Sequence, residues 1–279
     1  MALYSVNTNR DAMIALQNLN VTGAELGITQ QRISTGRKVD SAKDNGSTWA
    51  IAQSMRATSS SLNAVKDSLQ RGQSTLDVAL AAGSSVSDLL LQMKEKALAA
   101  SDTTLDTSSR SALNEDFKAL RDQLAKTVAN ADFNGTNMIK TGGSNIAALA
   151  NAAGTSKITV AAQSLGLGSA NLTGITSTSS LAPTSAGTAQ AMISTVNTAI
   201  GKVSTALAKM GTGSKALDMH LSFTMKLQDT LDSGVGNLVD ADLAKESAKL
   251  QSLQTRQQLG VQALSIANQS TSALLGLFR

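Results

Sequence analysis

The side chains that most often carry out chemistry in proteins are sparse in this sequence. The chain has 279 residues, no cysteine and a single histidine, His220. Without cysteine there are no disulfides, no thiolate nucleophile and no cysteine–zinc site. The helical zinc motif of metalloproteases needs two histidines four residues apart, which one histidine cannot supply. We therefore predict no metal site, and we expect His220 to be a packed or surface side chain rather than a ligand or a base.

The other candidates for catalysis are no stronger. Asp and Glu are scattered at helical spacings, so no pair of carboxylates stands apart for general acid–base work. Gly211-Thr212-Gly213 is too short for a phosphate-binding loop, and we interpret it as an interruption of a helix. Trp49 is expected to be a packing anchor. The sequence thus predicts no enzymatic activity and no cofactor, which leaves assembly or binding as its function.

The composition favours helices that pack in narrow seams. Apolar residues make up 42% of the chain and aromatic residues only 2%, so the apolar material is mainly aliphatic. Pro183 is the only proline, which permits very long helices. The net charge of +4 comes from interspersed signs rather than a basic patch, so we expect no nucleic-acid partner. The sequence has neither a run of eighteen apolar residues nor a signal peptide, so we expect no membrane insertion and no cleaved leader.

Apolar residues spaced alternately by four and three predict the helices of this chain, and we call such a series a ladder. Such a ladder runs from Ile51 to Ala97 and predicts a coiled-coil helix of about 70 Å. Further helices are expected over residues 105–128 and over a ladder that spans 193–231. We predict a mainly α protein, an elongated rod of long antiparallel coiled-coil helices in which the N- and C-terminal halves pair. The predicted seam consists of Ile51, Leu62, Val65, Leu69, Leu76, Leu90, Ile193, Val196, Ile200, Leu207 and Leu221.

The middle of the chain differs in character. From about residue 141 to 187 small and polar residues dominate and charge nearly vanishes, which predicts a short exposed β/loop insertion. Short strands are expected at 138–140 and 158–160, after a turn at Phe133-Asn134-Gly135. A flexible joint is expected at Asp232–Gly236 because of its two glycines.

The two ends of the chain carry related ladders. We predict that they pack on each other and on other subunits through Ala12, Leu16, Leu19, Leu26, Ile33, Leu250, Leu253, Leu264, Ala267, Leu274 and Phe278. A lone pair of such thin helices buries too little surface to offset its ordering entropy. We therefore hypothesise that both ends fold only in a polymer, which strong amide-exchange protection of residues 1–35 in the monomer would contradict.

Two ordered sets of motifs stand at opposite ends of the chain. The first set includes Ala15-Leu16-Gln17-Asn18-Leu19-Asn20, Arg32-Ile33-Ser34-Thr35-Gly36 and Ser41-Ala42-Lys43-Asp44-Asn45, and the second includes Asn237 to Ser247, Ala267-Asn268-Gln269 and Leu274 to Arg279. Together they resemble the N- and C-terminal signatures of bacterial flagellin, the subunit of the flagellar filament. The resemblance implies a structural subunit that polymerises into a helical propeller for swimming. It also implies three parts: an inner coiled-coil core of 1–45 and 234–279 with its joints, a helical wall of 46–140 and 188–233, and a variable surface insertion of 141–187.

The resemblance also implies where the chain works and with what. Its partners would be other flagellin subunits, possibly of more than one kind, the flagellar type III export apparatus with an export chaperone, and the hook-associated and cap proteins. It would be secreted into the extracellular filament. Flagellins can be O-glycosylated on exposed loops, so Ser177, Thr178, Ser179 and Ser180 are candidates, with an unmodified neutral loop as an equal alternative.

Segment 91–97 lies where enteric flagellins carry an arginine-containing stretch that the innate flagellin receptor reads. This chain has Met93, Glu95 and Lys96 there, so weak receptor recognition is predicted. The alternatives are a hook–filament junction protein with similar ends, or a secondary role as an adhesin or host-receptor ligand.

Overall fold

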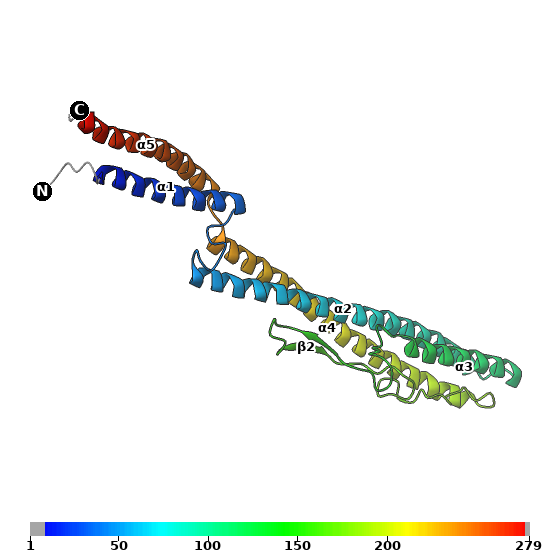
Figure 1. Ribbon diagram of the computed structural model, residues 1–279. Coiled ribbons are helices and arrows are strands. Elements are labelled where there is room, and N and C mark those ends of the chain that lie inside the picture. Colours follow the sequence, from blue (N-terminus) through cyan, green and yellow to red (C-terminus); the bar gives the residue numbers. More distant parts are fainter. Residues whose placement is uncertain (1–8, 277–279) are drawn as a thin grey trace. The chain divides into compact units, whose positions relative to one another are not determined.

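The computed structural model describes the backbone of residues 9–276 and the side chains of residues 9–269. In this range the chain forms α1 (Arg10–Thr35), α2 (Gly46–Ala100), α3 (Thr107–Ala129), β1 (Ile146–Leu149), β2 (Lys157–Val160), α4 (Ala186–Val239) and α5 (Leu243–Gly276) (Figure 1). The predicted mainly α fold class is confirmed. The described chain divides into two compact units, one made by residues up to 57 and from 230 onward, the other by residues 58–229.

In the first unit, α1 and α5 form an antiparallel helix pair. Asn9 caps α1 by accepting a hydrogen bond from the Ala12 N–H at 2.9 Å, and its Nδ2 donates to the Ala267 carbonyl oxygen at 2.7 Å. Near the other end of α1, Arg32 forms an ion pair of 3.1 Å with Glu246. Because the start of α1 meets the late part of α5 and its end meets the early part, the two helices run in opposite directions.

The same unit holds the joints that link this pair to the ends of α2 and α4. Gly36 ends α1 in a left-handed conformation, with φ of +69°, which favours glycine. Its carbonyl oxygen accepts from the Ala241 N–H at 2.9 Å. Beside it, a small core forms from Ala52, Val235 and Val239.

The predicted joint at Asp232–Gly236 is wrong. The helix α4 runs unbroken through it to Val239, and the break falls at residues 240–242 instead. Burial of Val235 and Val239 outweighs the helix penalty of the glycines. Gly234 also lies so close to Met55 that a Cβ there would stand 2.7 Å from the Met55 Cε.

In the second unit, α2 and α4 run antiparallel. Lys66 Nζ donates to Gln228 Oε1 at 2.9 Å, and further along α2 the bare face of Gly83 receives the Leu207 side chain. A Cβ at position 83 would lie 2.6 Å from Leu207 Cδ2, so glycine is what permits this close approach. The predicted pairing of the two long helices is therefore confirmed for this unit.

The helix expected over residues 105–128 is confirmed as α3, and it folds back on α2. Asp106 caps it by accepting from the Ser109 N–H at 2.9 Å, and Lys96 on α2 pairs with Asp116 at 2.8 Å. The connection is held by Arg110, which is buried. Its Nε donates to the Ala100 carbonyl oxygen at 3.0 Å, and its Nη2 donates to the carbonyl oxygens of Asp102 and Leu105.

The middle segment forms one antiparallel hairpin in which Ile146 pairs with Val160 and Leu149 with Lys157. The strand expected at 158–160 is confirmed, but the strand expected at 138–140 is wrong. Asn137 Oδ1 accepts from the N–H groups of residues 139 and 140 at 2.9 Å each, which bends the backbone into a turn instead of a ladder. Residues 138 and 139 are nevertheless fully buried.

The predicted helix interruption at residues 211–214 is also wrong, because α4 continues through it. Val160 of β2 lies against Gly213, where a Cβ would stand 2.6 Å from Val160 Cγ1. Gly213 therefore allows the hairpin to pack closely on α4, and it does not break the helix.

Candidate assembly surfaces

One face of α1 is turned toward α5. Four of the predicted end residues recur on it every seven positions, and all four are half-buried: Ala12, Leu19, Leu26 and Ile33. Leu19 packs against Gly260, where a Cβ would lie 3.2 Å from Leu19 Cδ1. This spacing is that of a coiled-coil seam.

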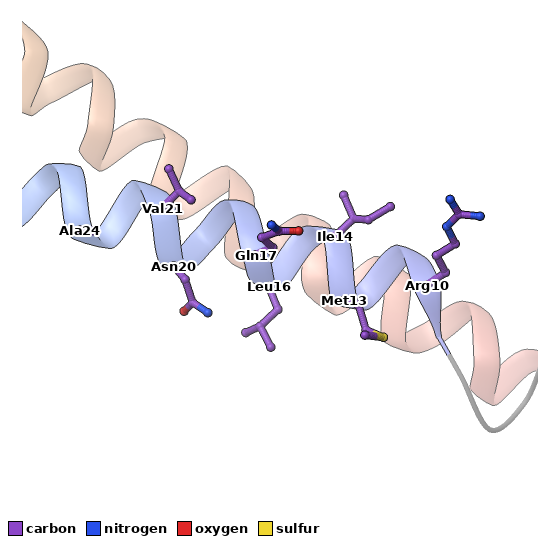
Figure 2. Close-up of a pocket in the computed structure, with 8 residues that line it drawn as sticks. All are labelled: Arg10, Met13, Ile14, Leu16, Gln17, Asn20, Val21 and Ala24. Atoms are coloured by element: carbon purple, nitrogen blue, oxygen red, sulfur yellow. The ribbon is translucent and has the colours of Figure 1, made fainter.

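A second apolar face of α1 points away from α5 and has no cover within the described residues. Met13 is 62% exposed, Ile14 49%, Leu16 48% and Val21 54%. These side chains border a shallow groove of about 680 Å³. Figure 2 shows them in two rows along the helix, with Met13 and Leu16 on one side and Ile14 and Val21 on the other. Leu16, expected on the seam with Ala12 and Leu19, belongs to this outer face.

The helix α5 has the same two-sided character. Leu253 is buried, while Leu250, Leu264 and Ala267 are half-buried on the face toward α1. On its other side Leu259 and Ile266 are exposed, and Val261 is exposed at the flank of the seam. The side chains of Leu274 and Phe278 lie outside the described residues, so their predicted packing stays a prediction.

The four–three spacing did not predict these outer faces, because it follows a single stripe of each helix. Other apolar residues stand between the positions of that spacing: Met13, Ile14, Val21, Val261 and Ile266. A helix that is apolar on two sides must be covered on two sides to bury both. That signal is present in the sequence and could have indicated a second partner for each terminal helix.

The predicted wall seam lies mostly in the interior of the second unit. Six of its residues are buried: Leu62, Val65, Leu69, Leu76, Leu90 and Val196. Ile193, Ile200, Leu207 and Leu221 are half-buried. Ile51 was placed wrongly, because it is 54% exposed and its neighbour Ala52 is fully buried. At this end of α2 the buried ladder runs through Ala52 and Ser59, one residue later than the ladder that begins at Ile51.

The side chains considered above for catalysis or metal binding make contacts that stabilise the fold. His220 is half-buried, and its Nε2 lies 2.7 Å from the Ala150 carbonyl oxygen, which links α4 to the end of β1. Its ring also lies 5.7 Å from that of Phe223. Across residues 9–276, no three His, Asp or Glu side chains gather closely enough to hold a metal ion. Among the helices described, none is long and apolar enough to cross a membrane.

The segment compared with the receptor-binding stretch is part of α2. Leu91 and Glu95 are exposed, Met93 is buried, and Lys96 is engaged with Asp116. The hydrogen bond to Asp116, followed by the charge of that carboxylate, raises the pKa of Lys96 above its ordinary value. Of the four candidate O-glycosylation residues, those at positions 177 and 178 are exposed, the one at 180 is half-buried and the one at 179 is buried.

The comparisons with known proteins agree with this architecture. Residues 6–144 match the bacterial flagellin N-terminal helical region, and residues 193–278 match the bacterial flagellin C-terminal helical region. Flagellin FljM of Caulobacter vibrioides is 61% identical over 100% of both chains. A flagellin of Brucella melitensis is 38% identical over 99% of this chain and 100% of its own. The crystal structure of Bacillus cereus flagellin matches with a TM-score of 0.50 and 26% identity, over 56% of this chain and 88% of that one.

Long helices that pair across the two ends of a sequence suit a structural protein that assembles, and the family that these comparisons show is structural rather than enzymatic. The chain belongs to the bacterial flagellin family. It is a structural subunit of the flagellar filament, an extracellular component, and its partners are other flagellin subunits. A hook–filament junction role and an adhesin role are not favoured.

Proposed function

We propose that the subunits polymerise by covering the outer apolar faces of α1 and α5. The observation that supports this most directly is the α1 groove, where Met13, Ile14, Leu16 and Val21 are each about half or more exposed. Exposed apolar side chains gathered on one face mark an interaction site. Heterologous contacts that do not close into a ring propagate as a helix, which is the geometry that a filament needs.

The test is seeded elongation with Leu16→Asp and the matched control Asn18→Asp. Both positions are exposed on α1, but Asn18 lies outside the groove, so the added charge is equal and only its place differs. Loss of one buried leucine weakens a contact by about 2 kcal/mol, or about thirtyfold in critical concentration. Leu16→Asp should fail to elongate filament fragments at concentrations where Asn18→Asp still does, with unchanged monomer circular dichroism. Elongation at the wild-type critical concentration would refute the proposal.

We also propose the layered arrangement in the filament. The paired ends, residues 1–45 and 234–279, form the inner core with its joints, residues 46–140 and 188–233 form the wall, and 141–187 face outward. Support comes from the α1–α5 pair, from the contacts between α2 and α4, and from the charge-poor segment 141–187. The chain is then secreted by the flagellar type III export apparatus with an export chaperone, and it meets the hook-associated and cap proteins at the filament ends. Limited proteolysis of filaments should cut within 141–187 before it cuts the ends.

For O-glycosylation, the accessible candidates are Ser177 and Thr178, because both are exposed. Ser179 is a poorer acceptor, because its hydroxyl donates to the Gly174 carbonyl oxygen at 3.1 Å inside the loop. Intact-mass measurement of native filaments separates a glycosylated loop from a bare one. Excess mass that maps to Ser179 alone would contradict this order of accessibility.

For the innate flagellin receptor, we propose weak recognition of α2. Arginine's planar guanidinium pairs with two acceptors at once, and Glu95 and Lys96 cannot reproduce that geometry. Lys96 is moreover paired with Asp116 within the subunit. A reporter-cell assay that gives full potency for this chain would contradict the proposal.

A further inference from the structure

The turn between α3 and the buried segment that follows it exposes a reactive dipeptide. Phe133 and Thr136 exchange two backbone hydrogen bonds of 3.0 Å around Asn134 and Gly135. The φ angles of Asn134 and Gly135 are +50° and +78°, which is a two-residue hairpin turn of the primed type. Asn134 is exposed, and its side-chain amide makes no hydrogen bond to the residues that the structure describes. The amide is therefore free to turn toward its own backbone.

We propose that Asn134–Gly135 is a self-modification site at which Asn134 converts to aspartate and isoaspartate without an enzyme. The Gly135 backbone nitrogen attacks Cγ of Asn134, so a new C–N bond closes a five-membered succinimide. The bond from Cγ to Nδ2 breaks, and the amide leaves as ammonia with the proton from the Gly135 nitrogen. Water then adds to either ring carbonyl and reopens the ring, returning a proton to that nitrogen. Glycine favours the attack because it has no side chain to obstruct the closing ring.

Asp132 sets the rate of this reaction. The Gly135 N–H donates to Asp132 Oδ1 at 2.8 Å. The nitrogen must lose that proton to become a nucleophile, and both the hydrogen bond and the nearby negative charge favour the protonated form. The carboxylate therefore slows the attack in the folded protein, and the reaction accelerates when this contact is lost.

The chain contains a second Asn-Gly pair, Asn45–Gly46, which provides an internal control. Asn45 Oδ1 accepts from the Thr48 N–H at 3.1 Å and from the Ser47 hydroxyl at 2.9 Å, so it caps the start of α2. Its amide must leave the cap before it can react. That cap involves no residue of the 132–136 turn, so changes at Asp132 leave the Asn45 rate as it is.

The product changes both charge and backbone at the turn. One conversion lowers the formal net charge from +4 to +3, because an amide becomes a carboxylate. Asn134 borders a cavity of about 220 Å³ in which Arg71 is the one charged side chain among the described lining residues. The new carboxylate therefore faces a site of opposite charge. Isoaspartate also adds a methylene group to the main chain, which is incompatible with the pairing of Phe133 and Thr136.

The experiment compares purified wild-type monomer with Asp132→Ala and Asp132→Asn during incubation at mildly alkaline pH. Peptide mapping by mass spectrometry follows isoaspartate and aspartate at positions 45 and 134, and the same chains in denaturant give the unhindered rates. Asp132→Ala should accelerate conversion at Asn134 about tenfold, the factor of one lost charge-assisted hydrogen bond, with Asn45 unchanged.

Asp132→Asn keeps a hydrogen-bond acceptor without the charge, so its conversion rate at Asn134 should lie between those of the wild type and Asp132→Ala. If Asp132→Ala does not fold, Asn45 and Asn134 will both convert at the rates measured in denaturant. The rate at Asn134 in folded Asp132→Asn then tests the role of Asp132. An Asn134 rate that is unchanged or slower in the folded variants would overturn the proposal, because Asp132 would then have no effect or would act as a base. Absence of any conversion at Asn134 would overturn it as well.

Discussion

Replacing Gly213 by alanine places a methyl group where α4 and the β1–β2 hairpin touch. A Cβ at this position would lie 2.6 Å from Val160 Cγ1 and 3.0 Å from its Cγ2. Valine is stiff about χ1, so the side chain cannot swing away and the hairpin itself must move. Gly211, two residues earlier in the same helix, has nothing within 4 Å of its Cβ position. The two glycines therefore form a matched pair in which only the packing differs.

The magnitudes follow from two opposing effects. Alanine in a helix interior is more favourable than glycine by about 1 kcal/mol, so Gly211→Ala should stabilise the protein by about that amount. Gly213→Ala gains the same helix propensity but suffers overpacking of about 1–3 kcal/mol. The difference between the two variants should therefore be about 1–3 kcal/mol, with Gly213→Ala the less stable.

The assay is urea unfolding of the monomer followed by circular dichroism. A double-mutant cycle with Val160→Ala isolates the contact, because that change removes both crowding methyl groups. Val160 is 6% exposed, so Val160→Ala alone should cost about 2 kcal/mol, and it should cost less in the Gly213→Ala background. If Gly213→Ala stabilises the protein as much as Gly211→Ala does, close packing is not the reason for this glycine.

Two further predictions concern the connection of α2 with α3. Arg110 donates to the carbonyl oxygens of residues 100, 102 and 105, and Arg110→Lys should leave some of them unpaired. The unfolding free energy should fall by about 2 kcal/mol, which thermal melting measures. An unchanged melting temperature would contradict this role. The Ser109 hydroxyl, followed by the Ser109 backbone N–H, holds the pKa of Asp106 below its ordinary 3.8. A depressed folded pKa gives stability that is present above the ordinary value and lost as the pH falls through the folded value. Asp106→Asn keeps a cap that does not titrate, so its unfolding free energy should fall less steeply than that of the wild type below pH 3.8; parallel curves would exclude the cap as a source of acid sensitivity.

Helix existence was predictable from the sequence, and so was the pairing of the two halves. Apolar residues at four–three spacing, together with a near absence of proline, leave few alternatives to long helices. The turn at Asn134-Gly135 was predictable for a local reason, since these residues adopt positive φ at little cost. Family membership was also readable, because the motifs at the ends are segments of linear sequence.

Glycines inside the long helices could not be interpreted from sequence. Gly213 and Gly234 have the local signature of a break, yet both lie in the unbroken α4. Their role depends on Val160 and Met55, which are distant in sequence and come close only in the folded chain. The helix penalty of about 1 kcal/mol for each glycine is smaller than the free energy gained by burying the surrounding side chains in a core.

The sequence by itself determined that this protein is built from long helices whose ends carry apolar stripes, because hydrophobic periodicity and composition are properties of the linear chain. Only the tertiary structure decided which stripe of each end is already covered. Ala12 and Leu19 face α5, while Leu16, on the same predicted ladder, points outward with Met13. The physical reason is that one neighbouring helix covers only one side of α1. The position of α5 determines which side that is, and the other apolar side stays exposed within the described residues.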